Sequence, residues 1–236
     1  MDDELSKLVN LARGGVLDLF QQLVTELRAR SHQHPEILVE FAAAPEEICR
    51  RAAIQAAAGR TEKIVVDAIT ALAGDPLPYV RQSLAYALTD NPTWPMDVAA
   101  EQLLSDHDSN VRQAAVWCVS CRPSLVGSLL KRLHAEDNAW VRGEVANALS
   151  YGPPRTVLPD LMTRLAEDVD TGVQQACAYT VEKHLGTSRG YPADLPRPGL
   201  TGLAEIRRRL TGMSAGAFPL LNTFLNEQLA HQVDIE

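Results

Sequence analysis

The chain has 236 residues, of which 46% are hydrophobic and only 5% are aromatic, and its formal net charge is −8. This apolar content suffices for a continuous core, and the acidic surface disfavours general binding to the phosphates of nucleic acids. No apolar stretch approaches the ~20 residues that cross a bilayer, and the acidic start of the chain is unlike a signal peptide. We therefore expect a cytoplasmic protein with no membrane or nucleic-acid partner.

Helical periodicity predicts two helices near 3–12 and 15–31, separated by Gly14-Gly15, which form an N-terminal cap over residues 1–32. Residues 33–185 follow as five units, each with an outer helix, a short turn and an inner helix. The predicted outer helices are 35–43, 62–73, 95–105, 123–135 and 154–166. The predicted inner helices are 46–58, 78–89, 109–121, 139–150 and 170–185. A Gly/Pro loop at 186–200 precedes helices near 201–211 and 215–231, which form a C-terminal cap over residues 201–236.

A Val-Arg pair recurs at the start of the inner helices, with an acidic residue five positions before the valine. The complete copies combine Asp75 with Val80-Arg81, Asp106 with Val111-Arg112, and Glu136 with Val141-Arg142. In a fourth copy, Asp168 precedes Val173 and Gln174 replaces the arginine. The valines are 31, 30 and 32 residues apart, and a degenerate copy at Ile48 lies 32 residues before the first. Such a period is typical of a protein built from stacked repeats.

The repeat begins with an acid, four residues and Val-Arg, and continues with small and aliphatic residues at helical spacing. This pattern resembles HEAT repeats, particularly short bacterial ones similar to the phycobilin-lyase HEAT-like type. Residues 75–88 and 136–149 match best, and residues 44–58 depart most because arginine does not follow Ile48. The resemblance implies an all-α fold, a right-handed α-solenoid of about five HEAT-like helix pairs with helical caps at both ends. We expect residues 1–236 to form a single domain.

The repeated acids and arginines could be catalytic or structural. Catalysis requires one asymmetric set of groups, whereas these pairs recur with every unit. The resemblance implies a structural ladder between the turns of neighbouring units, and a partly exposed pair would contribute ~0.2–1 kcal/mol. The ladder candidates are Asp75, Arg81, Asp106, Arg112, Glu136, Arg142 and Asp168.

Positions two, six and nine residues after each valine point away from the buried face of the inner helix, since a helix turns by ~100° per residue. Stacking would align them on an inner, usually concave surface, and Tyr and Trp are favoured binding anchors. The partner-binding candidates are Gln82, Tyr86, Gln113, Trp117, Asn147, Gln175 and Tyr179. The same count in the earliest unit selects Arg50, Ile54 and Ala57. Alternatively, the rings could pack against the adjacent repeat.

Other motifs have simpler structural interpretations. Cys118 and Cys121 have redox-motif spacing but lie at the end of an expected helix, and zinc would need two further ligands. We expect the cysteines to be reduced and mostly buried, with no metal site at His107 and His134. Asp106-His107-Asp108 suits the start of a helix. Arg207-Arg208-Arg209 suggests a solvated helix face, and loop 186–200 could contact a partner or be merely flexible.

These observations favour a non-enzymatic interaction module, an adaptor, scaffold or assembly factor that binds a protein or peptide and needs no cofactor. An inhibitor or immunity-type protein that neutralises an enzyme is an alternative, as is a structural subunit of a larger assembly. The resemblance also allows a DNA alkyl-base glycosylase, although such an enzyme should carry a basic stripe. A chromophore lyase would follow from the repeat similarity only.

Overall fold

The computed structural model describes residues 3–14, 17–213 and 216–230. These residues form α-helices and short 3-10 helices, and they contain no strand. The chain divides into two compact units, residues 1–122 and 123–236, and each is described by itself. The fold is the all-α solenoid that the repeats predict. The single-domain organisation stays a prediction.

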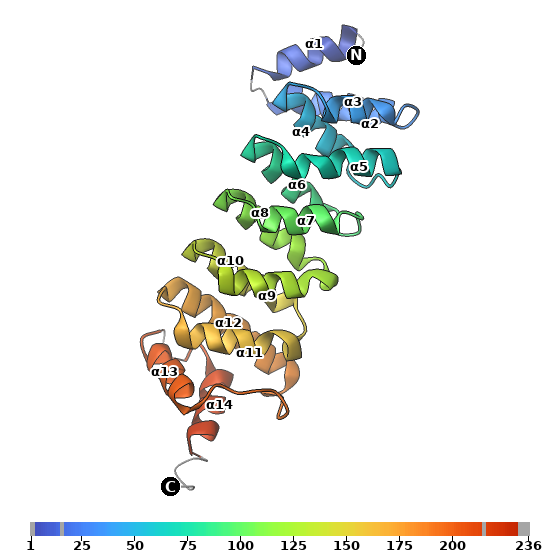
Figure 1. Ribbon diagram of the computed structural model, residues 1–236. Helices are drawn as coiled ribbons and strands as arrows, with labels where there is room; N and C mark the ends of the chain where they lie inside the picture. The colour runs from blue at the N-terminus through green and yellow to red at the C-terminus, as the bar shows by residue number, and fades with distance from the viewer. Residues whose placement is uncertain (1–2, 15–16, 214–215, 231–236) are drawn as a thin grey trace. The chain divides into compact units, whose positions relative to one another are not determined.

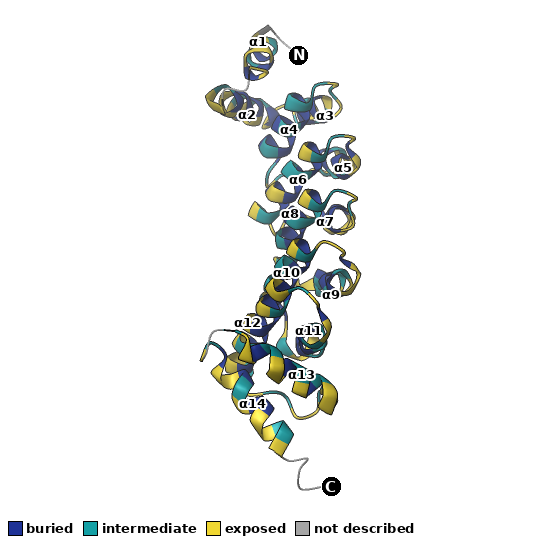
Figure 2. Ribbon diagram, turned by 90° about the vertical axis from the view of Figure 1, so that its left-hand side faces the viewer, coloured by how far each residue is buried: buried dark blue, intermediate teal, exposed yellow. Residues whose placement is uncertain are grey.

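The first unit is a series of antiparallel helix pairs (Figure 1). Its α-helices are α1 (Asp3–Ala12), α2 (Leu17–Ser31), α3 (Glu36–Ala42), α4 (Glu47–Ala56), α5 (Lys63–Ala71), α6 (Pro78–Asp90), α7 (Asp97–Leu104) and α8 (Ser109–Ser120). Helices α3, α5 and α7 form an outer row, while α2, α4, α6 and α8 form an inner row (Figure 2). The N-terminal cap therefore contributes α2 to the inner row.

The second unit repeats this arrangement. Its α-helices are α9 (Val126–Ala135), α10 (Ala139–Ala148), α11 (Pro154–Glu167), α12 (Thr171–Ser188), α13 (Leu200–Thr211) and α14 (Pro219–Ala230). Helix α13 packs on α11, and α14 packs on α12. The C-terminal cap is thus a further helix pair in the same stack.

The repeated valine lies on the buried face in the first turn of α6, α8, α10 and α12. Val80, Val111, Val141 and Val173 are all fully buried. Polar residues start three of these helices, because Asp108, Asn138 and Asp170 accept hydrogen bonds from backbone amides of the first turn. The local sequence therefore determines both where an inner helix starts and which side faces the core.

The C-terminal ends of the inner helices are held by side chains from the following pair. In the first unit, Arg122 Nη1 donates to the carbonyl oxygen of Leu88 at 3.1 Å. In the second unit, a ring nitrogen of buried His184 lies 3.0 Å from the carbonyl oxygen of Leu149. The Arg122 contact satisfies a carbonyl group in the last turn of α6, and the His184 contact adds to the hydrogen bond that the Leu149 carbonyl oxygen accepts from the Gly152 amide.

Several predicted boundaries need correction. Helix α12 continues to Ser188, so the first three residues of the predicted loop 186–200 are helical. The second cap helix begins at Pro219, and proline suits a first turn because the amide hydrogen that it lacks would have no partner there. Residue 215, near which this helix was predicted to start, lies outside the described residues. Gly15, predicted to separate the first two helices, lies outside the described residues. No described helix has the length and apolar character needed to cross a membrane.

The remaining part of the loop packs on the second unit. The Tyr191 ring stacks on Phe224 of α14 with centroids 4.9 Å apart, and its hydroxyl donates to the carbonyl oxygen of Pro196 at 2.7 Å. Arg155 of α11 forms an ion pair with Asp194. Contacts within the second unit therefore hold the loop at Tyr191 and Asp194.

Candidate functional site

The acids and arginines connect neighbouring helix pairs. Arg81 Nε and Nη2 donate to the two carboxylate oxygens of Asp106 at 2.6 and 2.8 Å. Arg81 Nη1 donates to the carbonyl oxygen of Asp75 at 2.7 Å, in the turn before its own helix. One guanidinium therefore fixes two successive turns, and its planar fork suits a bidentate contact with a carboxylate.

The second unit contains the same arrangement. Arg142 Nε and Nη2 donate to the carboxylate of Asp168 at 2.6 and 2.9 Å, and Nη1 donates to the carbonyl oxygen of Glu136 at 2.9 Å. Asp168 also accepts from the backbone N–H of Asp170 at 3.0 Å. The acid thus holds its own turn while it pairs with the preceding arginine.

These pairs are buried, which corrects the expectation that they are partly exposed. The side chains of Arg81 and Asp106 are only 4% and 5% exposed. Burial raises the pKa of Asp106, but hydrogen bonds from Arg81 and from the Asp108 amide outweigh burial, so this pKa lies below its ordinary value. The pairs are therefore internal ion pairs, and loss of one partner leaves a buried charge.

Arg50 is a ladder arginine that the sequence pattern missed. Its Nε and Nη2 donate to the carboxylate of Asp75 at 2.5 and 3.1 Å, and its Nη1 donates to the carbonyl oxygen of Ala44 at 3.0 Å. The buried position that matches the repeated valine is accordingly Cys49, and the register counted from Ile48 is wrong by one residue.

This shift also corrects the outward positions of the earliest unit. Arg50, Ile54 and Ala57 are buried, because a one-residue error rotates the helix face by ~100°. The positions that face outward are Arg51, Gln55 and Ala58. The constant separation of 25 residues between Arg50 and Asp75 and between Arg81 and Asp106 was the signal that could have identified Arg50.

The ladder changes at its C-terminal end. Gln174 Nε2 donates to the carbonyl oxygen of Asp168 at 2.8 Å, the turn contact that arginine makes elsewhere. Arg209 of α13 adds a hydrogen bond to the Leu165 carbonyl oxygen at 3.1 Å and one to that of Asp168. Arg209 is therefore a packed residue, which corrects the prediction that all three residues of 207–209 form a solvated face.

The predicted binding residues on α6 do face solvent, and they have an aromatic neighbour that the count missed. Tyr79 and Tyr86 are 53% and 52% exposed, and Gln82 lies between them. Gln82 Nε2 donates to the Tyr86 hydroxyl at 3.3 Å. We call Tyr79, Gln82 and Tyr86 the α6 stripe. Tyr79 was missed because it lies one turn before the first position counted.

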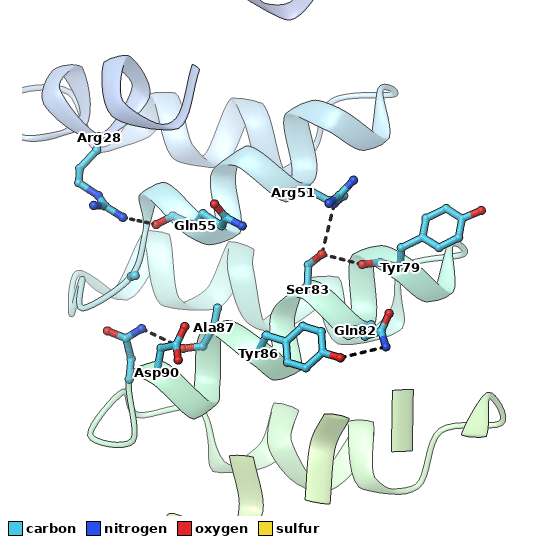
Figure 3. A pocket seen from close by; sticks show the side chains of 11 residues that line it. Arg28, Arg51, Gln55, Tyr79, Gln82, Ser83, Tyr86, Ala87 and Asp90 are labelled. Carbon is cyan, nitrogen blue, oxygen red and sulfur yellow. Dashed lines mark hydrogen bonds between the residues drawn. The ribbon is translucent and has the colours of Figure 1, made fainter. Parts of the chain in front are cut away.

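The α6 stripe lines a pocket of about 740 Å³ in the first unit (Figure 3). The opposite wall consists of Arg51, Gln55 and Ala58 from α4 and its end, with Arg28 from α2. The space lies in the volume range of ligand pockets and combines aromatic, amide and charged side chains. The predicted residues Gln82 and Tyr86 therefore belong to a formed cavity.

The other predicted binding residues lie in different surroundings. Trp117 is half-buried on α8, and Asn147 is half-buried on α10. Tyr179 is exposed but packs edge-on against Phe218, with ring centroids 5.0 Å apart. Gln113 is half-buried and Gln175 exposed; Gln175 lines a pocket of about 500 Å³ beside α13. Packing against the cap therefore accounts for part of the Tyr179 surface.

Trp140 is an exposed aromatic residue that the sequence count did not select. It is 60% exposed at the start of α10, directly before Val141. Tyr79 occupies the equivalent position directly before Val80. The position before the repeated valine therefore carries an exposed aromatic ring once in each unit.

The cysteines and histidines form no recognisable reactive site in the described residues. Cys49, Cys118 and Cys177 are buried free thiols, and Cys121 is exposed. Burial raises the pKa of the Cys118 thiol to about 12, which disfavours a reactive thiolate. No cluster of His, Cys, Asp or Glu that could hold a metal ion occurs in the described part of the chain.

The chain matches a known family of repeat proteins. The family model described as HEAT repeats matches residues 35–120, which covers helices α3 to α8. The matched segment contains the Arg50–Asp75 and Arg81–Asp106 pairs and most of the residues around the 740 Å³ pocket. No curated protein matches the chain.

Proposed function

Because residues 35–120 of this chain are HEAT repeats, we propose that the protein is a non-enzymatic interaction module that binds a protein or peptide on its inner helices. Stacked repeats of this kind present an extended surface, and HEAT repeats commonly mediate protein interactions. An adaptor, a scaffold or an assembly factor would use that surface in the same way.

The observation that carries the proposal is the exposure of the α6 stripe beside a formed pocket. Large aromatic residues are scarce in this chain, yet two are more than half exposed on one helix. Tyr side chains offer a broad apolar contact and a polar hydroxyl with few rotatable bonds, which is why they act as anchors at protein interfaces. The ladder, by contrast, is internal and offers its groups to neighbouring turns.

Photo-crosslinking in cells that express the chain tests this proposal. A photoreactive residue is placed at Tyr86, or in a separate variant at Trp140, on the inner helices. The matched controls place it at Ile64 and Val98, which are 54% and 73% exposed on the outer helices α5 and α7. Ile64 matches the exposure of Tyr86, and Val98 is more exposed than either test position, so burial would not explain a weaker adduct from the controls.

We expect a discrete protein adduct from at least one inner-helix position and a weaker or absent one from both controls. The partner, identified by mass spectrometry, is then assayed with and without the purified chain. Loss of enzymatic activity of the partner indicates an inhibitor, and unchanged activity indicates an adaptor or scaffold. Adducts only from Ile64 or Val98 would place recognition on the outer helices and refute the proposal.

A further inference from the structure

The pocket beside the α6 stripe has walls of different charge. Its α2 and α4 wall carries two arginines, Arg28 and Arg51, whereas the α6 wall carries one carboxylate, Asp90 (Figure 3). A local excess of positive charge contrasts with the net charge of −8 for the whole chain. The charged side chains that line the pocket are therefore two arginines and one carboxylate, one positive charge in excess.

Arg28 is the group on this wall with unused hydrogen-bonding capacity. Its Nη2 donates to the carbonyl oxygen of Gln55 at 2.6 Å, a contact that fixes the position of the guanidinium. Among the residues that the structure describes, no carboxylate pairs with Arg28. The side chain is exposed, and a guanidinium has five N–H donors. It can accordingly donate to a carboxylate of another molecule while it keeps its hydrogen bond to the Gln55 carbonyl oxygen of α4.

Arg51 is held more firmly and supports the same wall. Its Nη1 lies 3.2 Å from a carboxylate oxygen of Glu47, its Nε donates to the Ser83 hydroxyl at 3.3 Å, and its guanidinium lies 5.4 Å from the centre of the Phe20 ring. The Ser83 contact joins the two walls of the pocket. Arg51 therefore contributes positive charge at a fixed place, although Glu47 partly neutralises it.

The α6 wall offers contact to apolar groups. Tyr79 and Tyr86 are two helical turns apart, so their Cα atoms are separated by about 10 Å along the helix axis. Ala58 and Ala87 have small side chains, which leave open space between the helices. The amides of Gln55 and Gln82 can donate to, or accept from, the backbone of an extended segment.

We propose that this pocket binds a protein segment in which an acidic side chain stands close to a large apolar or aromatic one. The acidic group pairs with Arg28, next to the charge of Arg51, and the apolar group lies against the α6 stripe. This inference rests on the proposed function and specifies which segment the first unit recognises. Asp90 lies on the α6 wall, toward the end of the pocket that holds Arg28 and Gln55 (Figure 3), so its charge opposes a carboxylate there and the acidic group must pair directly with Arg28.

Displayed random peptides selected on the purified full-length chain provide the first test. We expect the enriched sequences to contain Asp or Glu near an aromatic or aliphatic residue. An enriched peptide is then labelled and its dissociation constant is measured by fluorescence anisotropy, beside a copy in which Asn or Gln replaces the acid. Loss of one charge-assisted hydrogen bond should weaken binding about tenfold.

Charge variants connect the binding to the pocket. Arg28→Glu and the milder Arg28→Gln should each weaken the acidic peptide at least about tenfold, whereas Asp90→Asn should leave binding unchanged or tighten it. Arg207→Glu is the matched control, because it makes the same charge change at an exposed arginine of the second unit. Circular dichroism confirms that each variant is folded.

Three outcomes would overturn the inference: no enriched sequence, an enriched basic sequence, or acidic peptides that bind Arg28→Glu as tightly as the unaltered chain. Crosslinks from Tyr86 or Trp140 in cells would still support the proposed function in each case. Absence of those crosslinks, together with tight binding of acidic peptides, would support the pocket inference and count against the proposed function. The two claims can therefore fail independently.

Discussion

Arg81 reaches across two turns, binding the Asp106 carboxylate through Nε and Nη2 and the Asp75 carbonyl oxygen through Nη1. The same three contacts recur at Arg142, with Asp168 and Glu136. A contact that recurs with the repeat sets the separation of neighbouring helix pairs. It leaves the less regular residues on the exposed face of the inner helices for recognition.

Replacement of Arg81 by Met should destabilise the protein by about 3 kcal/mol, since it leaves the Asp106 carboxylate buried without its partner. The free energy of unfolding in urea measures the effect. The double variant Arg81→Met/Asp106→Leu should recover much of the loss, because both charges are then removed. A double variant less stable than Arg81→Met would show that the ion pair itself is strongly favourable.

Arg50 and Arg51 are adjacent in sequence, but we expect the same substitution to lower the free energy of unfolding much more at Arg50 than at Arg51. Arg50→Met should destabilise as much as Arg81→Met, because Arg50 pairs with buried Asp75. Arg51→Met should change the free energy of unfolding by less than about 1 kcal/mol, since its ion pair with Glu47 is partly exposed. Equal effects of the two variants would contradict the corrected register.

These two residues also show what the sequence could and could not predict. Three Val-Arg copies predicted the helix pairs and the ladder, because valine and arginine recur where burial and turn contacts require them. In the first repeat, α3 and α4, Cys49 takes the place of the valine, and the neighbouring Ile48 is the more typical hydrophobic core residue. The pattern therefore gave a register that was wrong by one residue there. Packing of Tyr179 on Phe218 was not predictable, since it joins residues far apart in sequence.

The pocket illustrates a second limit. Gln82 and Tyr86 were predicted to face outward from helical periodicity within α6. Their opposite wall combines Arg28 of α2 with Arg51 of α4, and periodicity within one helix says nothing about which neighbour is close. Arg51 was hidden by the register error in α4, and Arg28 by the assignment of its helix to the N-terminal cap.

Two glycines of the second unit should respond oppositely to alanine. A Cβ atom at Gly152 would lie 2.8 Å from Val157 Cγ1 and 3.2 Å from Val126 Cγ2, so Gly152→Ala should destabilise by about 1–3 kcal/mol. A Cβ at Gly143 in α10 meets nothing within 4 Å, and Gly143→Ala should stabilise by about 1 kcal/mol through helix propensity. Thermal unfolding measures both, and a stabilising Gly152→Ala would contradict the packing described here.

His184 should make stability depend on pH. Burial lowers the pKa of its imidazole below the ordinary value of 6.5, partly offset by the hydrogen bond to Leu149, so the folded state favours the neutral ring. Its contribution is complete above the unfolded pKa and is lost as pH falls below 6.5 toward the lower folded pKa. His184→Gln keeps an N–H donor but cannot titrate. Between about pH 7.5 and pH 5 the unaltered chain should lose more stability than this variant, and equal losses would exclude the role of His184.

The separation of scaffold from recognition can be tested by one paired measurement. The free energy of unfolding and the affinity for the crosslinked partner are determined for Arg81→Met and Tyr86→Ala under the same conditions. We expect Arg81→Met to lower stability while the molecules that remain folded still bind, and Tyr86→Ala to keep stability while affinity falls about tenfold or more. Normal stability with lost binding in Arg81→Met, or lost stability with unchanged affinity in Tyr86→Ala, would contradict the assignment of Arg81 to the scaffold and of Tyr86 to recognition.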